Sequence, residues 1–170
     1  MKEITGDLFQ QDCDAICITT NGFLKKNGEA VMGRGCALTA CKLWPNMKKL
    51  VGHALHHNGN KPTVVKQIKR YDIVTFPVKP ASIVYNGSNI VGHQRKYFDV
   101  GDTVPGWAAK ASLEIIEQSA HALVQLADEH GWDTVVIPRP GCGAGELGWP
   151  QVKPVLEPIL DDRFSIITFN

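Results

Sequence analysis

Short apolar runs alternate with longer segments of helical periodicity along this chain. Residues 107–130 repeat apolar side chains at every third or fourth position, which predicts a helix with one face on a core, and Gly131 predicts its end. Runs rich in β-branched residues predict strands. The predicted strands are residues 2–5, 14–20, 63–69, 71–77, 133–138 and 164–169.

Three further segments have weaker helical patterns, at residues 34–43, 46–57 and 149–160. The last begins with Pro150, a favourable early helical position, and Pro154 and Pro158 predict that it is short or bent. Strands interleaved with helices are typical of an α/β domain with helices on both faces of the sheet. We therefore expect a three-layer α/β/α domain with a mixed, largely parallel sheet of six strands.

Residues 80–106 interrupt this alternation because they show no convincing period. A long irregular stretch inside a compact domain is typical of a functional lid, so we expect one domain over residues 1–170 with a lid-like insertion. The stretch contains VGHQRKYFD at residues 91–99, where basic residues mixed with aromatic ones favour phosphate binding and base stacking. An ordinary surface excursion is the alternative interpretation.

Length, composition and charge limit the kinds of protein that this chain can be. With 170 residues, 44% hydrophobic, the chain is long enough for one globular domain, and its net charge of +1 disfavours strong non-specific binding of nucleic acid. Five cysteines without CxxC spacing, and histidines without an HExxH motif, favour neither a disulfide framework nor a metal site. We expect buried thiols in a reducing compartment. Without an apolar leader or a run of about 20 apolar residues, the sequence predicts a cytoplasmic protein with no membrane partner.

Two glycine-rich segments are the candidates for ligand binding. RPGCGAGELGW (139–149) follows a predicted strand and precedes a predicted helix, and NGEAVMGRGCA (27–37) also leads into a helix. Glycines there let backbone N–H groups approach an anion such as a diphosphate, although a tight turn alone also explains them. Neither segment matches GxxxxGK[ST] or the usual setting of GxGxxG. This favours binding of a phosphorylated ligand over nucleotide hydrolysis or redox chemistry, and implies no cofactor.

The sequence resembles the macrodomain family. The motifs that carry the resemblance are ITGDLF (4–9), DAICITTNG (14–22), MGRGCALTACKLWP (32–45), IVTFPVK (73–79) and RPGCGAGELGWPQVKP (139–154). They cover most of the chain except residues 80–106. The sequence is most similar to the branch of terminal ADP-ribose glycohydrolases and of macrodomain antitoxins that remove ADP-ribose from DNA.

The resemblance implies binding of ADP-ribose and hydrolysis of an ADP-ribosyl linkage on protein or nucleic acid. Lys79 matches the catalytic lysine of that branch, although a solvent-exposed lysine at a strand end is the alternative. Asn21 is implied to orient the distal ribose, and Asp7 to accept a hydrogen bond from adenine. The ligand-binding residues implied are Asp7, Leu8, Asn21, Met32, Gly33, Arg34, Gly35, Pro140, Gly141, Cys142, Gly143, Ala144 and Gly145.

Gly145 is a departure, because the terminal protein glycohydrolases carry an aspartate there; the glycine resembles the DNA-directed type, and Glu146 lies beside it. If the acceptor is a nucleic acid, Arg95, Lys96 and Tyr97 are the residues to test. Two other functions stay open: a non-catalytic ADP-ribose reader, and a phosphatase acting on ADP-ribose 1″-phosphate. Cys142 has no basic neighbour in the sequence, so we do not expect it to be a nucleophile.

Overall fold

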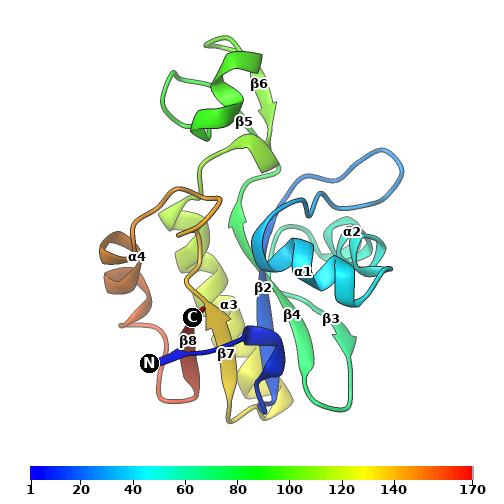
Figure 1. Cartoon of the computed structure of the whole chain (residues 1–170), viewed down its shortest axis with the longest axis vertical. Helices are drawn as coiled ribbons and strands as arrows, with labels where there is room; N and C mark the ends of the chain where they lie inside the picture. Colours follow the sequence, from blue (N-terminus) through cyan, green and yellow to red (C-terminus); the bar gives the residue numbers. More distant parts are fainter. Residues whose placement is uncertain (170) are drawn as a thin grey trace.

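The computed structural model describes residues 1–169 and alternates strands with helices along the chain (Figure 1). Three short 3₁₀ helices, η1 to η3, accompany the longer elements. In chain order the elements are β1 (Lys2–Thr5), η1 (Leu8–Gln10), β2 (Ala15–Asn21), α1 (Gly35–Leu43), α2 (Met47–Asn58), β3 (Val64–Gln67), β4 (Asp72–Lys79), β5 (Ser82–Val84), η2 (Gly92–Tyr97), β6 (Thr103–Pro105), η3 (Gly106–Ala108), α3 (Leu113–His130), β7 (Val135–Pro138), α4 (Trp149–Leu156) and β8 (Phe164–Thr168).

The central sheet has six strands in the order β1-β8-β7-β2-β4-β3. All neighbouring pairs are parallel except β3 with β4. The bounds of each of these strands differ from those of a predicted strand by at most two residues at either end. Together with the strand directions, this confirms the prediction of a mixed, largely parallel sheet. Because β1, β2, β4, β7 and β8 all run the same way, their carboxyl ends meet at one edge of the sheet.

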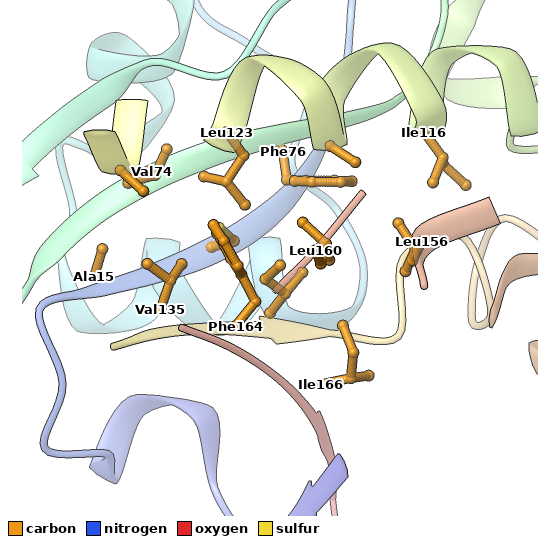
Figure 2. Close-up of a cluster of buried hydrophobic side chains, with 14 of the residues drawn as sticks. Ala15, Val74, Phe76, Ile116, Leu123, Val135, Leu156, Leu160, Phe164 and Ile166 are labelled. Carbon is orange, nitrogen blue, oxygen red and sulfur yellow. The ribbon is translucent and has the colours of Figure 1, made fainter. Parts of the chain in front are cut away.

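Helices cover both faces of the sheet, which confirms the three-layer prediction. Figure 1 shows α1 and α2 on one side and α3 and α4 on the other. On the α3 side, Figure 2 shows Ile116 and Leu123 of α3 facing Val74 and Phe76 of β4. Phe164 of β8 fills the same cluster and is fully buried. The two cores hold the strands rigidly, so residues at their carboxyl ends have fixed positions.

The long helix α3 begins later than the periodicity predicts. Ser112 caps it, with its side chain accepting a hydrogen bond from the N–H of Ile115 at 3.3 Å. Residues 107–112 were predicted as part of this helix, which is wrong: Trp107 and Ala108 belong to η3 and pack in the apolar cluster of residues 83–108, and Ala111 packs in the core on the α3 side. The helix ends as expected at Gly131, whose φ is 67°. Ser119, on its buried face, donates a 2.7 Å hydrogen bond to the carbonyl of Pro77 in β4.

The segment between β4 and α3 is folded, contrary to the lack of period in its sequence. We call residues 80–111 the insertion. Strands β5 and β6 pair antiparallel within it, and its own apolar cluster contains Tyr85, Ile90, Val104 and Ala108. Figure 1 shows it projecting beyond the carboxyl end of β4. Its two strands have only three residues each, which is too short for a periodic pattern in the sequence.

The five cysteines are all free thiols. Only Cys17, in β2, is buried; Cys13, Cys36, Cys41 and Cys142 are half-buried. The expectation of buried thiols is therefore wrong for four of the five. These four lie at strand ends, in helix α1 and in the second glycine segment, where the apolar core does not enclose them.

Candidate functional site

A cavity of about 410 Å³ opens at the carboxyl edge of the sheet. This volume is in the range that small-molecule sites usually have, about 300–1,000 Å³. Its walls come from the ends of β2 and β4, from the two glycine segments and from the insertion. The lining residues are Thr19, Thr20, Asn21, Val31, Met32, Gly33, Arg34, Gly35, Cys36, Ala37, Val78, Lys79, Val91, His93, Gln94, Trp107, Pro138, Arg139, Gly141, Gly143, Ala144 and Gly145.

The first glycine loop, residues 31–37, forms one wall and leads into α1. Arg34 is the N-cap residue of α1, and its side chain caps no N–H within residues 1–169. A Cβ added at Gly33 would meet nothing in the described chain within 4 Å. The free N–H groups at the start of α1 and the open space at Gly33 suit an anionic group close to the backbone.

The second glycine loop, residues 139–148, forms the facing wall. Gly141 has a φ of 76°, which favours glycine, and a Cβ there would lie 2.8 Å from the Cβ of Ala111. Gly143 is different, since a Cβ there would meet nothing in residues 1–169 within 4 Å. Gly141 is therefore required by the loop itself, whereas Gly143 lines the cavity and has open space where a side chain would lie.

Lys79 ends β4 between these two loops and is only 8% exposed. Its Nζ donates hydrogen bonds to the carbonyls of Trp107 at 3.1 Å and Ala144 at 3.4 Å. Burial lowers the pKa of Lys79 to about 8; the carboxylate of Glu146 opposes this shift and the charge of Arg34 adds to it. With this pKa, part of the Lys79 side chains carry a neutral amine near neutral pH, and only the neutral amine has a free electron pair.

Asn21 lies beside Lys79 because their strands are neighbours in the sheet. The parallel register of β2 and β4 pairs Asn21 with Lys79, after an irregularity at the end of β2. The Asn21 side-chain amide donates to the carbonyl of Val31 at 2.9 Å and accepts from the N–H of Phe23 at 3.0 Å. One amide N–H of Asn21 is left for another partner.

The lysine and arginine residues that line the cavity give its wall positive charge. Arg34, Lys79 and Arg139 line it, and no Asp or Glu of residues 1–169 is among the lining residues. The guanidinium of Arg139 lies 5.0 Å from the ring centroid of Trp149 and 3.9 Å from a carboxylate oxygen of Glu3. The site therefore favours an anionic ligand and lacks the carboxylate pair of ordinary glycosidases.

Known structures share this architecture. No protein-family model and no curated protein matches the sequence. Among solved structures, the macrodomain of Mycobacterium tuberculosis DarG matches with a TM-score of 0.67 at 22% identity, over 97% of this chain and 96% of that one. The macrodomain of Thermus aquaticus DarG matches with a TM-score of 0.70 at 20% identity, over 99% and 97%. The fold is that of a macrodomain.

A third match is the structure of Thermosipho africanus DarTG in complex with ADP-ribose. Its TM-score is 0.70 at 16% identity, and the match covers 99% of this chain and 42% of that one. The resemblance inferred from the sequence motifs is thus confirmed at the level of the fold.

Several predicted ligand residues lie outside the cavity lining. Asp7 accepts a hydrogen bond from the N–H of Phe9 at 2.9 Å and caps η1, and Leu8 is buried below it. Pro140 is buried, and Cys142 points its thiol towards the Pro140 carbonyl at 3.6 Å. Burial raises the pKa of Cys142, which keeps the thiol protonated and unsuited to nucleophilic attack.

Asp7 nevertheless lies at the same edge of the sheet as the cavity, because it follows β1. The N–H of Gly6 donates to the carbonyl of Thr168 at 2.9 Å, so the chain after β1 runs beside the chain after β8. Phe169 comes next and is 76% exposed. The chain after β8 thus brings an exposed aromatic residue close to the segment that carries Asp7.

The sequence interpretation missed the contribution of the insertion to the cavity. His93 and Gln94 of η2 and Trp107 of η3 line it, whereas the neighbouring Tyr97 does not and is 66% exposed. No motif signals these contacts, because they depend on how the insertion folds back. Arg139 was overlooked too, although its place just after a strand and before the glycines was a usable signal.

Among the side chains that the structure describes, no group of three or more His, Cys, Asp or Glu residues is arranged to hold a metal ion. Within residues 1–169, none of the helices combines the length and apolar character needed to cross a membrane.

Proposed function

We propose that this chain binds ADP-ribose and hydrolyses an ADP-ribosyl linkage. The observation that carries the proposal is the buried Lys79, whose pKa is lowered to about 8, between two glycine loops in a cationic cavity. The macrodomain fold and the ADP-ribose complex of DarTG support the choice of ligand.

The proposed ligand lies along the carboxyl edge of the sheet. Its diphosphate sits between Gly33 and Gly143, where the open backbone and the helix start favour an anion. Its distal ribose reaches Asn21 and Lys79, and its adenine extends towards Asp7, an acceptor suited to an exocyclic amine. Phe169, missed in the sequence, offers a ring on which adenine can stack.

Lys79 then acts as the nucleophile in its neutral form. The amine nitrogen bonds to the anomeric carbon of the distal ribose, the bond to the acceptor breaks, and its electron pair leaves with the acceptor. The proton lost by the new ammonium goes to the acceptor. A water molecule next attacks the anomeric carbon, the carbon–nitrogen bond breaks, and one water proton goes to the Lys79 nitrogen, so that ADP-ribose and free Lys79 result. The lack of a carboxylate among the described lining residues favours this route over a carboxylate pair.

The acceptor is a protein carboxylate or a nucleic-acid base. It lies beyond Lys79, on the side of the cavity closed by η2 of the insertion. Arg95, Lys96 and Tyr97 at the outer part of η2 are exposed, and we propose them as the first residues to contact a nucleic acid. Their replacement would weaken hydrolysis of a nucleic-acid substrate and leave a modified protein unaffected.

A non-catalytic reader is the second candidate function. One observation favours it: the Nζ of Lys79 already holds the insertion and the second glycine loop together through Trp107 and Ala144. A lysine with this structural task needs no chemistry. A reader would bind ADP-ribose and turn nothing over.

The test is a panel of three substrates with wild-type protein: ADP-ribosylated DNA, ADP-ribosylated protein and ADP-ribose 1″-phosphate. We expect ADP-ribose release from one of the first two, at a rate that rises with pH and levels off above about pH 8, where Lys79 is neutral. Inorganic phosphate release from the third would establish the phosphatase instead. Binding of ADP-ribose with no turnover of any substrate would establish the reader, and no binding would refute the proposal altogether.

A further inference from the structure

Glu146 has an unusual backbone conformation in the second glycine loop. With a φ of 63°, it is the one residue other than glycine with a positive φ in the described part of the chain. Side chains disfavour this left-handed conformation, which a glycine adopts freely. The loop has glycines at 141, 143, 145 and 148 but a glutamate at this position. A contact made by its side chain would explain the choice.

That contact is with the insertion. The Oε2 of Glu146 accepts a hydrogen bond from the N–H of Gly92 at 2.9 Å. Gly92 is the first residue of η2, and the residue before it, Val91, offers no side-chain cap within residues 1–169. Glu146 therefore satisfies an N–H at the start of η2 from 54 residues away in the sequence.

Few bonds hold the outer part of the insertion. In the part of the chain that the structure describes, the bond from Gly92 to Glu146 is the one hydrogen bond between residues 82–105 and the domain outside the insertion. The base of the insertion is tied down separately, since the N–H of Ala111 donates to the carbonyl of Gly145 at 3.0 Å. Loss of the Glu146 contact would free η2 without detaching that base.

The position of η2 matters because it forms a wall of the cavity. His93 and Gln94 directly follow Gly92 and both line the cavity with Lys79. The same glutamate also acts on Lys79 through its charge. One side chain thus connects the insertion, the glycine loop and the candidate nucleophile.

We infer that Glu146 is a positioning residue that latches η2 to the second glycine loop and so fixes His93 and Gln94 as the acceptor-side wall of the cavity. The contact between Glu146 and η2 is present in the protein without ligand. Its effect on the choice of acceptor rests on the proposed function. A substrate enters past this wall, so the latch sets which acceptors fit beside Lys79.

Two variants separate the latch from other effects. Glu146→Gly removes the acceptor oxygen and relieves the backbone at φ 63°. Glu146→Gln keeps an oxygen that accepts from Gly92 and serves as the matched control. Hydrogen exchange of residues 91–97, measured without ligand, should become at least about tenfold faster in the glycine variant, as expected for loss of a hydrogen bond to a charged group, and change by less than about threefold in the glutamine variant.

The denaturation midpoint of Glu146→Gly should stay near that of the wild type, because relief of the strained backbone at residue 146 offsets the lost hydrogen bond to Gly92. Unchanged exchange in Glu146→Gly would overturn the latch, as would equal acceleration in both variants. With a macromolecular substrate, Glu146→Gly should change KM at least about threefold while the Kd for free ADP-ribose changes less than twofold, a difference that assigns the wall to the acceptor side. Equal changes in both constants would refute that assignment. If the wild type turns over no substrate, the proposed function fails, and the exchange data still decide the latch.

Discussion

Replacement of Gly143 by alanine should weaken ligand binding without harming the fold. Gly143 lines the cavity, and a Cβ built there meets no atom of residues 1–169 within 4 Å. The change therefore introduces no clash in the free protein. We expect the free energy of unfolding to stay within about 0.5 kcal/mol of wild type, or to rise by up to about 1 kcal/mol because alanine restricts the unfolded chain.

Gly145 provides the contrast within the same loop. A Cβ there would lie 2.6 Å from the Cβ of Ala111 and 2.6 Å from the carbonyl oxygen of Gly141. Backbone must move to relieve these contacts, so Gly145→Ala should lower the free energy of unfolding by about 1–3 kcal/mol. Gly148→Ala is the control for binding, because its Cβ would have only ordinary contacts, 3.6 Å or more, and Gly148 is not a lining residue.

Urea denaturation and calorimetry with ADP-ribose measure the two effects separately. We expect Gly143→Ala to bind at least tenfold more weakly, about 1.4 kcal/mol or more, with a normal denaturation curve. Gly148→Ala should bind like the wild type. If Gly143→Ala binds ADP-ribose normally, the ligand does not approach this backbone, and the placement of the diphosphate between the loops is wrong.

Three further predictions concern Lys79, Ser119 and Glu146. The folded-state pKa of Lys79, about 8, lies below its ordinary value of 10.5, so the unfolded state binds more protons between these pH values. The free energy of unfolding of the wild type should therefore rise with pH across this range, relative to that of Lys79→Met. A difference that stays flat or falls with pH would contradict the burial of the charge. Ser119→Ala leaves the buried carbonyl of Pro77 unpaired and should lower the free energy of unfolding by about 1–3 kcal/mol in urea denaturation, whereas no loss would mean that another group replaces the hydroxyl. Glu146→Gln removes the charge that raises the pKa of Lys79, so the inflection in the pH–rate profile should move below about pH 8; an inflection that stays in place would exclude this electrostatic contact.

The strands of the central sheet, and the proximity of Asn21 to Lys79, could be predicted from the sequence. β-Branched runs buried on both faces identify the strands, and the parallel arrangement then brings strand ends to one edge. The family resemblance singled out Asn21 and Lys79, each of which lies just past a predicted strand, and they are register neighbours in the structure. The apolar stripe of α3 was equally readable, apart from its start at Ser112.

The insertion could not be predicted, because its structure depends on contacts between distant residues. Its strands are too short for a visible alternation, and Gly92 meets Glu146 only after residues 80–111 fold back over the cavity. The pKa of Lys79 was also beyond the sequence, since it results from burial beneath Trp107 and Ala144. No local pattern reports the burial of a lysine at a strand end.

The most direct test of the proposed hydrolase compares wild type with Lys79→Ala and with Lys42→Ala, a control at an exposed lysine in the last turn of α1. ADP-ribose release is measured on the substrate that the wild type hydrolyses, and ADP-ribose binding is measured by calorimetry on all three proteins. We expect Lys79→Ala to bind ADP-ribose yet release at least about a hundredfold less product, while Lys42→Ala matches the wild type. Turnover by Lys79→Ala at the wild-type rate would show that the chemistry belongs to another residue.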